Sequence, residues 1–170
     1  MAEPMKSTVW RAMIIVIFAI AAFMPATQAV AEKSGTFSAN WIASGKLQPF
    51  DFVEGRQVGT FKLSGNVSLK NEIAGIADFW GECVGLSDSV AGGSVRCVWR
   101  SMNGEKAYSV LKGQPLKEGV KVTGEFVGGT DSLKGLTGMF NFTWKSTFTD
   151  ENQGIFTGHT QDLKGSYSIP

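Results

Sequence analysis

The stretch VGGTDSLKGLTGMFNFTWKS, Val127–Ser146, decides the interpretation of the whole sequence. Four glycines fall between Val127 and Gly138, and aromatic residues then stand at every second position, Phe140, Phe142 and Trp144. Alternation of apolar and polar residues is typical of a β-strand with one buried face. Glycines allow the chain to turn sharply, so this stretch predicts a tight corner followed by an aromatic strand.

A glycine-rich loop can also bind phosphate, but the pattern here does not fit that chemistry. A P-loop requires G-x-x-x-x-G-K-[ST] between a strand and a helix. In this loop Lys134 precedes Gly135 instead of following it, and no helical periodicity comes after it. The loop therefore indicates a feature of the fold and not a nucleotide site.

Period-2 alternation recurs outward from this stretch, in short segments bounded by Gly, Asn, Asp or Ser. We expect strands at Gly35–Ala43, Gln57–Leu69, Ile76–Val84, Ser94–Met102, Lys106–Lys112, Val120–Val127, Thr137–Phe148, Ile155–Thr160 and Gly165–Ile169. Eight or nine strands joined by tight turns predict an all-β domain. We expect a closed antiparallel barrel of about eight strands, because closure removes the two exposed sheet edges. A two-sheet β-sandwich is the alternative that periodicity leaves open.

The N-terminus has the character of a secretory signal peptide. Lys6 and Arg11 precede the apolar run Ala12–Met24, and an A-x-A site follows at Ala29–Ala31. The run is shorter than the roughly 20 apolar residues that cross a bilayer. We expect cleavage after about Ala31, which leaves residues 32–170 as a single secreted or periplasmic domain with no membrane attachment. An uncleaved anchor is the alternative.

The charge balance limits the partners. The chain has 16 Lys and Arg residues against 15 Asp and Glu residues, and removing the leader with Lys6, Arg11 and Glu3 makes the two counts equal. Nucleic acids and anionic membranes call for a basic surface. Neither is therefore expected as the main partner.

Two cysteines flank the loop Leu86–Gly93 between two predicted strands. In a regular hairpin centred near Val90, Cys83 stands opposite Cys97. Cysteines paired across adjacent antiparallel strands can form a disulfide, and disulfides persist in exported proteins. We predict this bridge; free thiols or half a metal site are the alternatives. With one histidine in the chain no metal site is expected.

The same register separates two faces of the hairpin. Phe79, Gly81, Val95 and Trp99 share the face of the cysteines, and Asp78, Trp80, Glu82, Arg96, Val98, Arg100 and Met102 share the other. On that second face Trp80 would form a cation–π pair with Arg100, and Glu82 would lie diagonal to both arginines. The cluster is either a solvated outer face with weak ion pairs or, if it points inward, a pocket for a small organic anion or a polarisable carbonyl.

Signals for catalysis are few. The sequence has no G-x-S-x-G and no H-E-x-x-H, and its one histidine is His159. His159 could act as a base with Asp162, but a structural role is more common for a lone strand histidine. No residue is therefore assigned as catalytic, and no cofactor is expected.

The segment Val127–Thr130, followed by Leu133–Gly138 and an alternating strand, resembles the glycine signature of the allene oxide cyclase barrel-like superfamily. That superfamily includes dirigent proteins, allene oxide cyclases and many small exported bacterial proteins, and its pattern is roughly G-G-T-G-x-[FY]-x-G-[IA]-x-G. Asp131 replaces its third glycine and Leu133 its aromatic residue. The resemblance implies an eight-stranded barrel with an apolar interior, and the trimers and dimers of plant members leave a homo-oligomer open.

Two functional hypotheses follow. The first is a barrel that binds a small apolar or amphipathic ligand without catalysis, with Trp80, Glu82, Arg96, Arg100, Phe140, Phe142 and Trp144 as candidate ligand-binding residues. The second is a cyclase or isomerase that acts on a reactive hydrophobic substrate inside the barrel. A weaker third is a structural or partner-binding envelope protein. An interior filled by Trp99, Phe140, Phe142 and Trp144 would exclude the first two.

Overall fold

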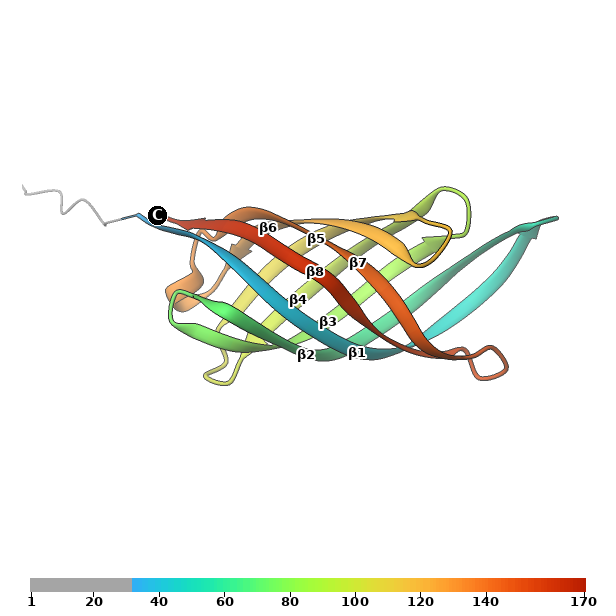
Figure 1. The fold of residues 1–170 in the computed structure, drawn as a ribbon, viewed down its shortest axis with the longest axis horizontal. Helices are drawn as coiled ribbons and strands as arrows, with labels where there is room; N and C mark the ends of the chain where they lie inside the picture. The colour runs from blue at the N-terminus through green and yellow to red at the C-terminus, as the bar shows by residue number, and fades with distance from the viewer. Residues whose placement is uncertain (1–31) are drawn as a thin grey trace, which may run out of the picture. The chain divides into compact units, whose positions relative to one another are not determined.

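Residues 32–170 form a closed antiparallel barrel in the computed structural model, which describes this part of the chain (Figure 1). The predicted signal peptide, residues 1–31, lies outside the described residues. The elements are β1 (Lys33–Val53), β2 (Arg56–Ile73), β3 (Ile76–Asp88), β4 (Gly92–Ser101), β5 (Lys106–Pro115), β6 (Val120–Gly129), the 3-10 helix η1 (Asp131–Leu133), β7 (Thr137–Asp150) and β8 (Ile155–Ile169). Each strand pairs with the next, and β8 pairs with β1. The predicted barrel is confirmed, and the sandwich alternative is wrong.

The barrel has eight strands and not nine, because the predicted strands Ile155–Thr160 and Gly165–Ile169 are one continuous strand, β8. β8 continues through the polar segment between Thr160 and Gly165, where Asp162 has a φ of 54° and the register with β1 shifts. This is a β-bulge, which accommodates extra residues without ending a strand. The alternation is interrupted at a bulge, so the sequence pattern suggested a break.

β1 and β2 are longer than predicted, and their hairpin extends past the end of β8 at one end of the barrel. β1 pairs with β8 as far as Lys46 and with β2 as far as Val53, while β2 pairs with β3 as far as Val58. In the last part of the hairpin the outer edge of β1 therefore has no neighbouring strand. Figure 1 shows this hairpin extending beyond the other turns at that end. Pro49 lies in the extended part, where its missing N–H is tolerated because proline is compatible with an edge strand.

The two ends of the barrel differ. At one end, which we call the closed end, the segment that joins β6 to β7 folds over the interior and contributes Leu133 and Leu136, both 0% exposed. The backbone of this segment bonds to itself and to β5, with Leu133 N–H donating to Thr130 O (2.9 Å) and Thr130 N–H to Lys106 O (2.8 Å). At the other end, the open end, lie the turns β1–β2, β3–β4, β5–β6 and β7–β8. The glycine-rich loop is therefore part of the plug of the closed end.

Asp131 stands where the superfamily pattern that the sequence resembles has its third glycine. Its φ is 54°, in the left-handed region that glycine adopts freely. Aspartate is one of the few other residues that visit this region, because its short polar side chain can bond locally. Asp131 therefore adopts the backbone conformation that a glycine would take at this turn. Leu133, at the aromatic position, still fills the barrel end.

None of the helical segments in residues 32–170 has the length and apolar character needed to span a bilayer.

Candidate ligand cavity at the open end

Aromatic side chains fill the closed half of the barrel. The indole of Trp99 lies 5.2 Å from the ring of Phe126 and 5.4 Å from that of Phe140, measured between centroids, in edge-to-face contacts. Its Nε1 donates to Ser109 Oγ at 3.0 Å, so the buried indole is fully satisfied. Edge-to-face pairs at these distances are favourable beyond the area they bury. This half is therefore a conventional core.

The open half contains a cavity of ≈ 710 Å³. Its apolar walls come from all eight strands and include Trp41, Leu47, Phe61, Leu63, Val95, Leu111, Val120, Val122, Phe142, Trp144, Ile155 and Phe156. Cys83 also lines it, so the disulfide lies against the cavity. Phe61, Val95, Val120, Trp144 and Phe156 face the interior yet remain only partly buried. The volume is in the range of small-molecule sites, which are mostly apolar and concave.

Glycines and small residues make room for this cavity beside the aromatic rings. Gly93, Gly113 and Ser146 lie along its wall, while Trp41 packs edge-on to Trp144 with centroids 5.8 Å apart. Trp41 is buried, and its Nε1 has no hydrogen-bond partner within residues 32–170. This Nε1 lies against Gly81, where an added Cβ would be 3.5 Å from it, so it is part of the packed wall.

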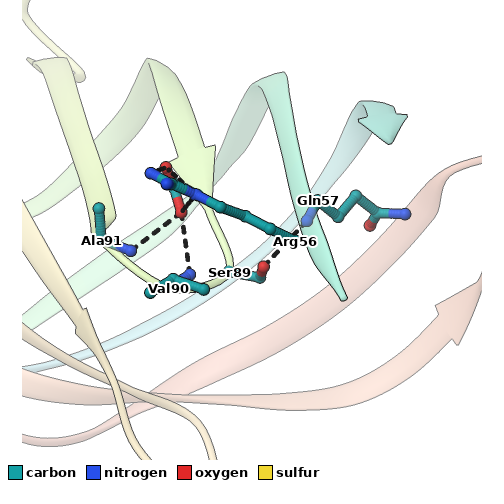
Figure 2. A network of polar contacts seen from close by, with 6 residues as sticks. Arg56, Gln57, Ser89, Val90 and Ala91 are labelled. Atoms are coloured by element: carbon teal, nitrogen blue, oxygen red, sulfur yellow. Dashed lines mark hydrogen bonds and ion pairs between the residues drawn. The ribbon is translucent and has the colours of Figure 1, made fainter. Parts of the chain in front are cut away.

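A polar network fixes the mouth of the cavity (Figure 2). Asp88, at the end of β3, accepts hydrogen bonds from Arg56 Nε (3.1 Å) and Nη2, and from the backbone N–H groups of Val90 and Ala91 (both 2.9 Å). The Arg56 hydrogen bonds, followed by those from Ala91 and Val90, lower the pKa of Asp88 well below its usual range. The same contact raises the pKa of Arg56.

The network joins the first residues of β2, beside the β1–β2 turn, to the β3–β4 turn. Ser89 N–H donates to Gln57 O (2.9 Å), and Gln57 N–H donates to Ser89 Oγ (3.0 Å), as Figure 2 shows in part. The Arg56 guanidinium also lies 5.6 Å from the centroid of the Phe52 ring, a cation–π distance. The mouth is therefore pinned along the β2–β3 side.

The predicted disulfide is confirmed, with Cys83 opposite Cys97 in the β3–β4 register and an S–S bond of 2.00 Å. The cysteine face of this hairpin points inward, with Phe79, Cys83, Cys97 and Trp99 all buried.

The opposite face of the hairpin therefore points outward. Trp80 is 49% exposed, and Glu82, Arg96 and Arg100 are also on the outer surface. These four candidate ligand-binding residues do not line the interior cavity. The interpretation as a solvated face fits their positions, because burying three charged side chains would require full pairing. Arg100 is opposite Trp80, as expected, but its Nη2 donates to Glu82 Oε2 at 3.4 Å.

The three aromatic candidates on β7 divide between the two halves. Phe140 is 2% exposed and belongs to the packed core, whereas Phe142 and Trp144 line the cavity. Unbroken alternation along the predicted strand Thr137–Phe148 would place Phe148 on the same face, but it is 56% exposed. The register between β7 and β8 shifts between Ser146 and Phe148, and this bulge turns Phe148 outward.

Sequence reasoning did not single out several cavity residues, notably Phe61, Val95, Val120, Val122 and Phe156. All of them stand at alternating positions of predicted strands, so their inward direction could have been inferred. Their separation from the packed core could not, because it depends on which rings meet across the barrel. His159 lies on the outer face of β8, opposite Ile42 and Lys145.

Fold and site together define a closed eight-stranded antiparallel barrel with a packed half and an apolar end cavity. No family model matches the chain, and no curated protein matches it. Among solved structures, the barrel is similar to the pterocarpan synthase dirigent protein GePTS1, with 12% identity and a TM-score of 0.48. The match covers 87% of this chain and 98% of the other. A likeness of this size carries no argument about function, and the closure of the barrel rests on the strand pairing itself.

Proposed function

We propose that this protein is an exported barrel that binds a small apolar or amphipathic ligand in the open-end cavity without chemical conversion. The observation that carries the proposal is the ≈ 710 Å³ space, lined by partly buried aromatic and aliphatic side chains and open at a polar mouth. Apolar side chains left in contact with solvent inside a barrel gain free energy when a ligand covers them, about 25 cal/mol per Å².

Export and family membership are parts of the same proposal. The Cys83–Cys97 disulfide fits an oxidising compartment, secreted or periplasmic, and the leader-like sequence of residues 1–31 agrees with it. The glycine pattern of the β6–β7 segment supports placing the chain among the allene oxide cyclase barrel-like and dirigent-like proteins.

The alternative function, a cyclase or isomerase, is not favoured by the positions of the charged side chains. It relied on Glu82, Arg96 and Arg100 pointing into the barrel, and all three are on the outer surface. The charged residues that line the cavity in the described part of the chain are Asp88, Asp150 and Glu151, at its mouth. Asp88 is held by Arg56, so it is a poor proton acceptor.

Fluorescence titration with N-phenyl-1-naphthylamine, a neutral apolar dye, tests the proposal. Val95 faces the cavity, so Val95→Trp should fill part of it and weaken binding at least about tenfold, which corresponds to about 1.4 kcal/mol. Met139→Trp, which adds the same ring on the outer face of β7, is the matched control and should bind like the wild type. Equal binding by both variants, or no saturable binding by the wild type, would contradict the proposal.

A further inference from the structure

A second concave surface lies on the outside of the barrel, away from the cavity mouth. This outer groove has a volume of ≈ 700 Å³ and crosses strands β1 to β6. Its outward-facing side chains are of three kinds, namely aliphatic or aromatic (Val84, Val98, Tyr108, Val127), hydroxyl (Ser44, Ser64) and charged (Lys46, Lys62, Glu82, Arg96). It therefore combines an apolar floor with an excess of positive charge.

Lys46 and Lys62 stand directly opposite each other on β1 and β2. Like charges at directly opposed positions of an antiparallel pair destabilise the sheet. The three ion pairs found within residues 32–170 are Arg56–Asp88, Arg100–Glu82 and Lys145–Glu118, so neither lysine is neutralised by a carboxylate there. An anion bound between the two ammonium groups would convert this repulsion into attraction.

The other charges of the groove add to this imbalance. Glu82 is the one carboxylate among the lining residues, and it is engaged by Arg100. Arg96 lies in the same cross-strand row as Lys62, with Val84 between them. Two strand spacings separate the backbones of Lys62 and Arg96 by about 10 Å. Arg96 Nη1 donates to Val95 O at 3.1 Å and to Ser94 Oγ at 3.4 Å, which holds the guanidinium beside β4 at the edge of the groove.

We propose that the outer groove binds an amphipathic organic anion, with its phosphate or carboxylate group between Lys46 and Lys62. Its apolar part would lie on Val84 and Val98, and Arg96 would contact the far end. The ligand chemistry is that of an alkyl or aryl phosphate, which could be a free metabolite or the headgroup of an anionic lipid. The site is separate from the interior cavity and does not depend on the function proposed for it.

Calorimetric titration with hexyl phosphate tests this proposal. Lys46→Gln and Lys62→Gln should each weaken binding about tenfold, since each removes one charge-assisted contact. Lys164→Gln is the matched control, because Lys164 is an outer lysine on β8 that does not line the groove. Equal affinity in all three variants, absence of binding by the wild type, or equal binding of uncharged hexanol would overturn the proposal.

Three further readouts separate the remaining explanations. Without ligand, the melting temperature of Lys62→Gln should be no lower than that of the wild type, because a like-charge contact is removed. Added hexyl phosphate should raise the melting temperature of the wild type more than that of the variant. Cosedimentation with phosphatidylcholine vesicles, with and without phosphatidylglycerol, distinguishes the two sources, since only a headgroup site would retain the protein on the anionic vesicles. Binding of N-phenyl-1-naphthylamine should be unchanged in both lysine variants, which separates this site from the cavity.

Discussion

Gly124 offers a direct test of whether the closed half of the barrel is densely packed. It lies on β6 opposite Phe140 of β7, and the phenyl ring covers its backbone. A Cβ added at Gly124 would come within 2.3 Å of Phe140 Cε2 and Cζ. The ring cannot move away easily, because its centroid is 4.9 Å from that of Phe126 and 5.4 Å from that of Trp99.

We therefore expect Gly124→Ala to destabilise the protein. Overpacking a dense core costs about 1–3 kcal/mol, while the lower chain entropy of alanine in the unfolded state returns about 0.4–1 kcal/mol. The net loss in the free energy of unfolding is about 1–2 kcal/mol. Urea unfolding should show a lower midpoint with an unchanged m-value.

Gly81→Ala is the control for this prediction. Gly81 also faces the interior, but its added Cβ would meet Val67 Cγ2 at 3.3 Å and Trp41 at 3.5 Å, contacts that small shifts accommodate. We expect its unfolding free energy to stay within about 0.5 kcal/mol of the wild type, because the entropic gain offsets a slight crowding. If the two variants lose the same stability, the closed half is not packed as described, and the division of the barrel into two halves fails.

Two further predictions concern the disulfide and the mouth of the cavity. Replacing Cys83 and Cys97 together with alanine should lower the free energy of unfolding by about 3 kcal/mol, the chain-entropy value for a loop of this size. In urea unfolding, the reduced wild type should match this double variant. A double variant as stable as the oxidised wild type would refute the estimate. Because Arg56 holds the pKa of Asp88 below its unfolded value, the pair stabilises the fold above about pH 4 and this contribution is lost as pH falls through the folded pKa. The difference in melting temperature between wild type and Asp88→Asn should therefore be constant from neutral pH to about pH 4 and shrink at lower pH; a difference that persists unchanged in strong acid would contradict this assignment.

Local spacing was sufficient to predict the hairpin register and the disulfide. The positions of Cys83 and Cys97 about a single turn determine that they face each other, and the same spacing placed Trp80 opposite Arg100. Spacing alone did not decide which face points inward, since each carries a tryptophan. The concentration of charge on the Glu82 face was the signal that favours solvent, and the structure agrees with it.

The bulges and the cavity could not be predicted in the same way. Bulges at Asp162 and near Phe148 shift the alternation by one residue, and no glycine or proline at these two positions marks them. The projecting hairpin was missed, since the first predicted strand ended at Ala43 whereas β1 continues to Val53. Pro49 is compatible with this longer strand because it lies where β8 no longer pairs. The cavity depends on which interior rings reach one another across the barrel, a property of the assembled sheet.

The central claim, that a ligand binds inside the open half, is tested most directly by methyl NMR. Val95, Leu111 and Val122 line the cavity, whereas Val84 and Val127 are on the outer surface. On titration with N-phenyl-1-naphthylamine, we expect shift changes and intermolecular NOEs at the three cavity residues and unchanged signals at the two outer ones. Contacts of the dye confined to Val84 and Val127, with the cavity methyls unaffected, would contradict the account.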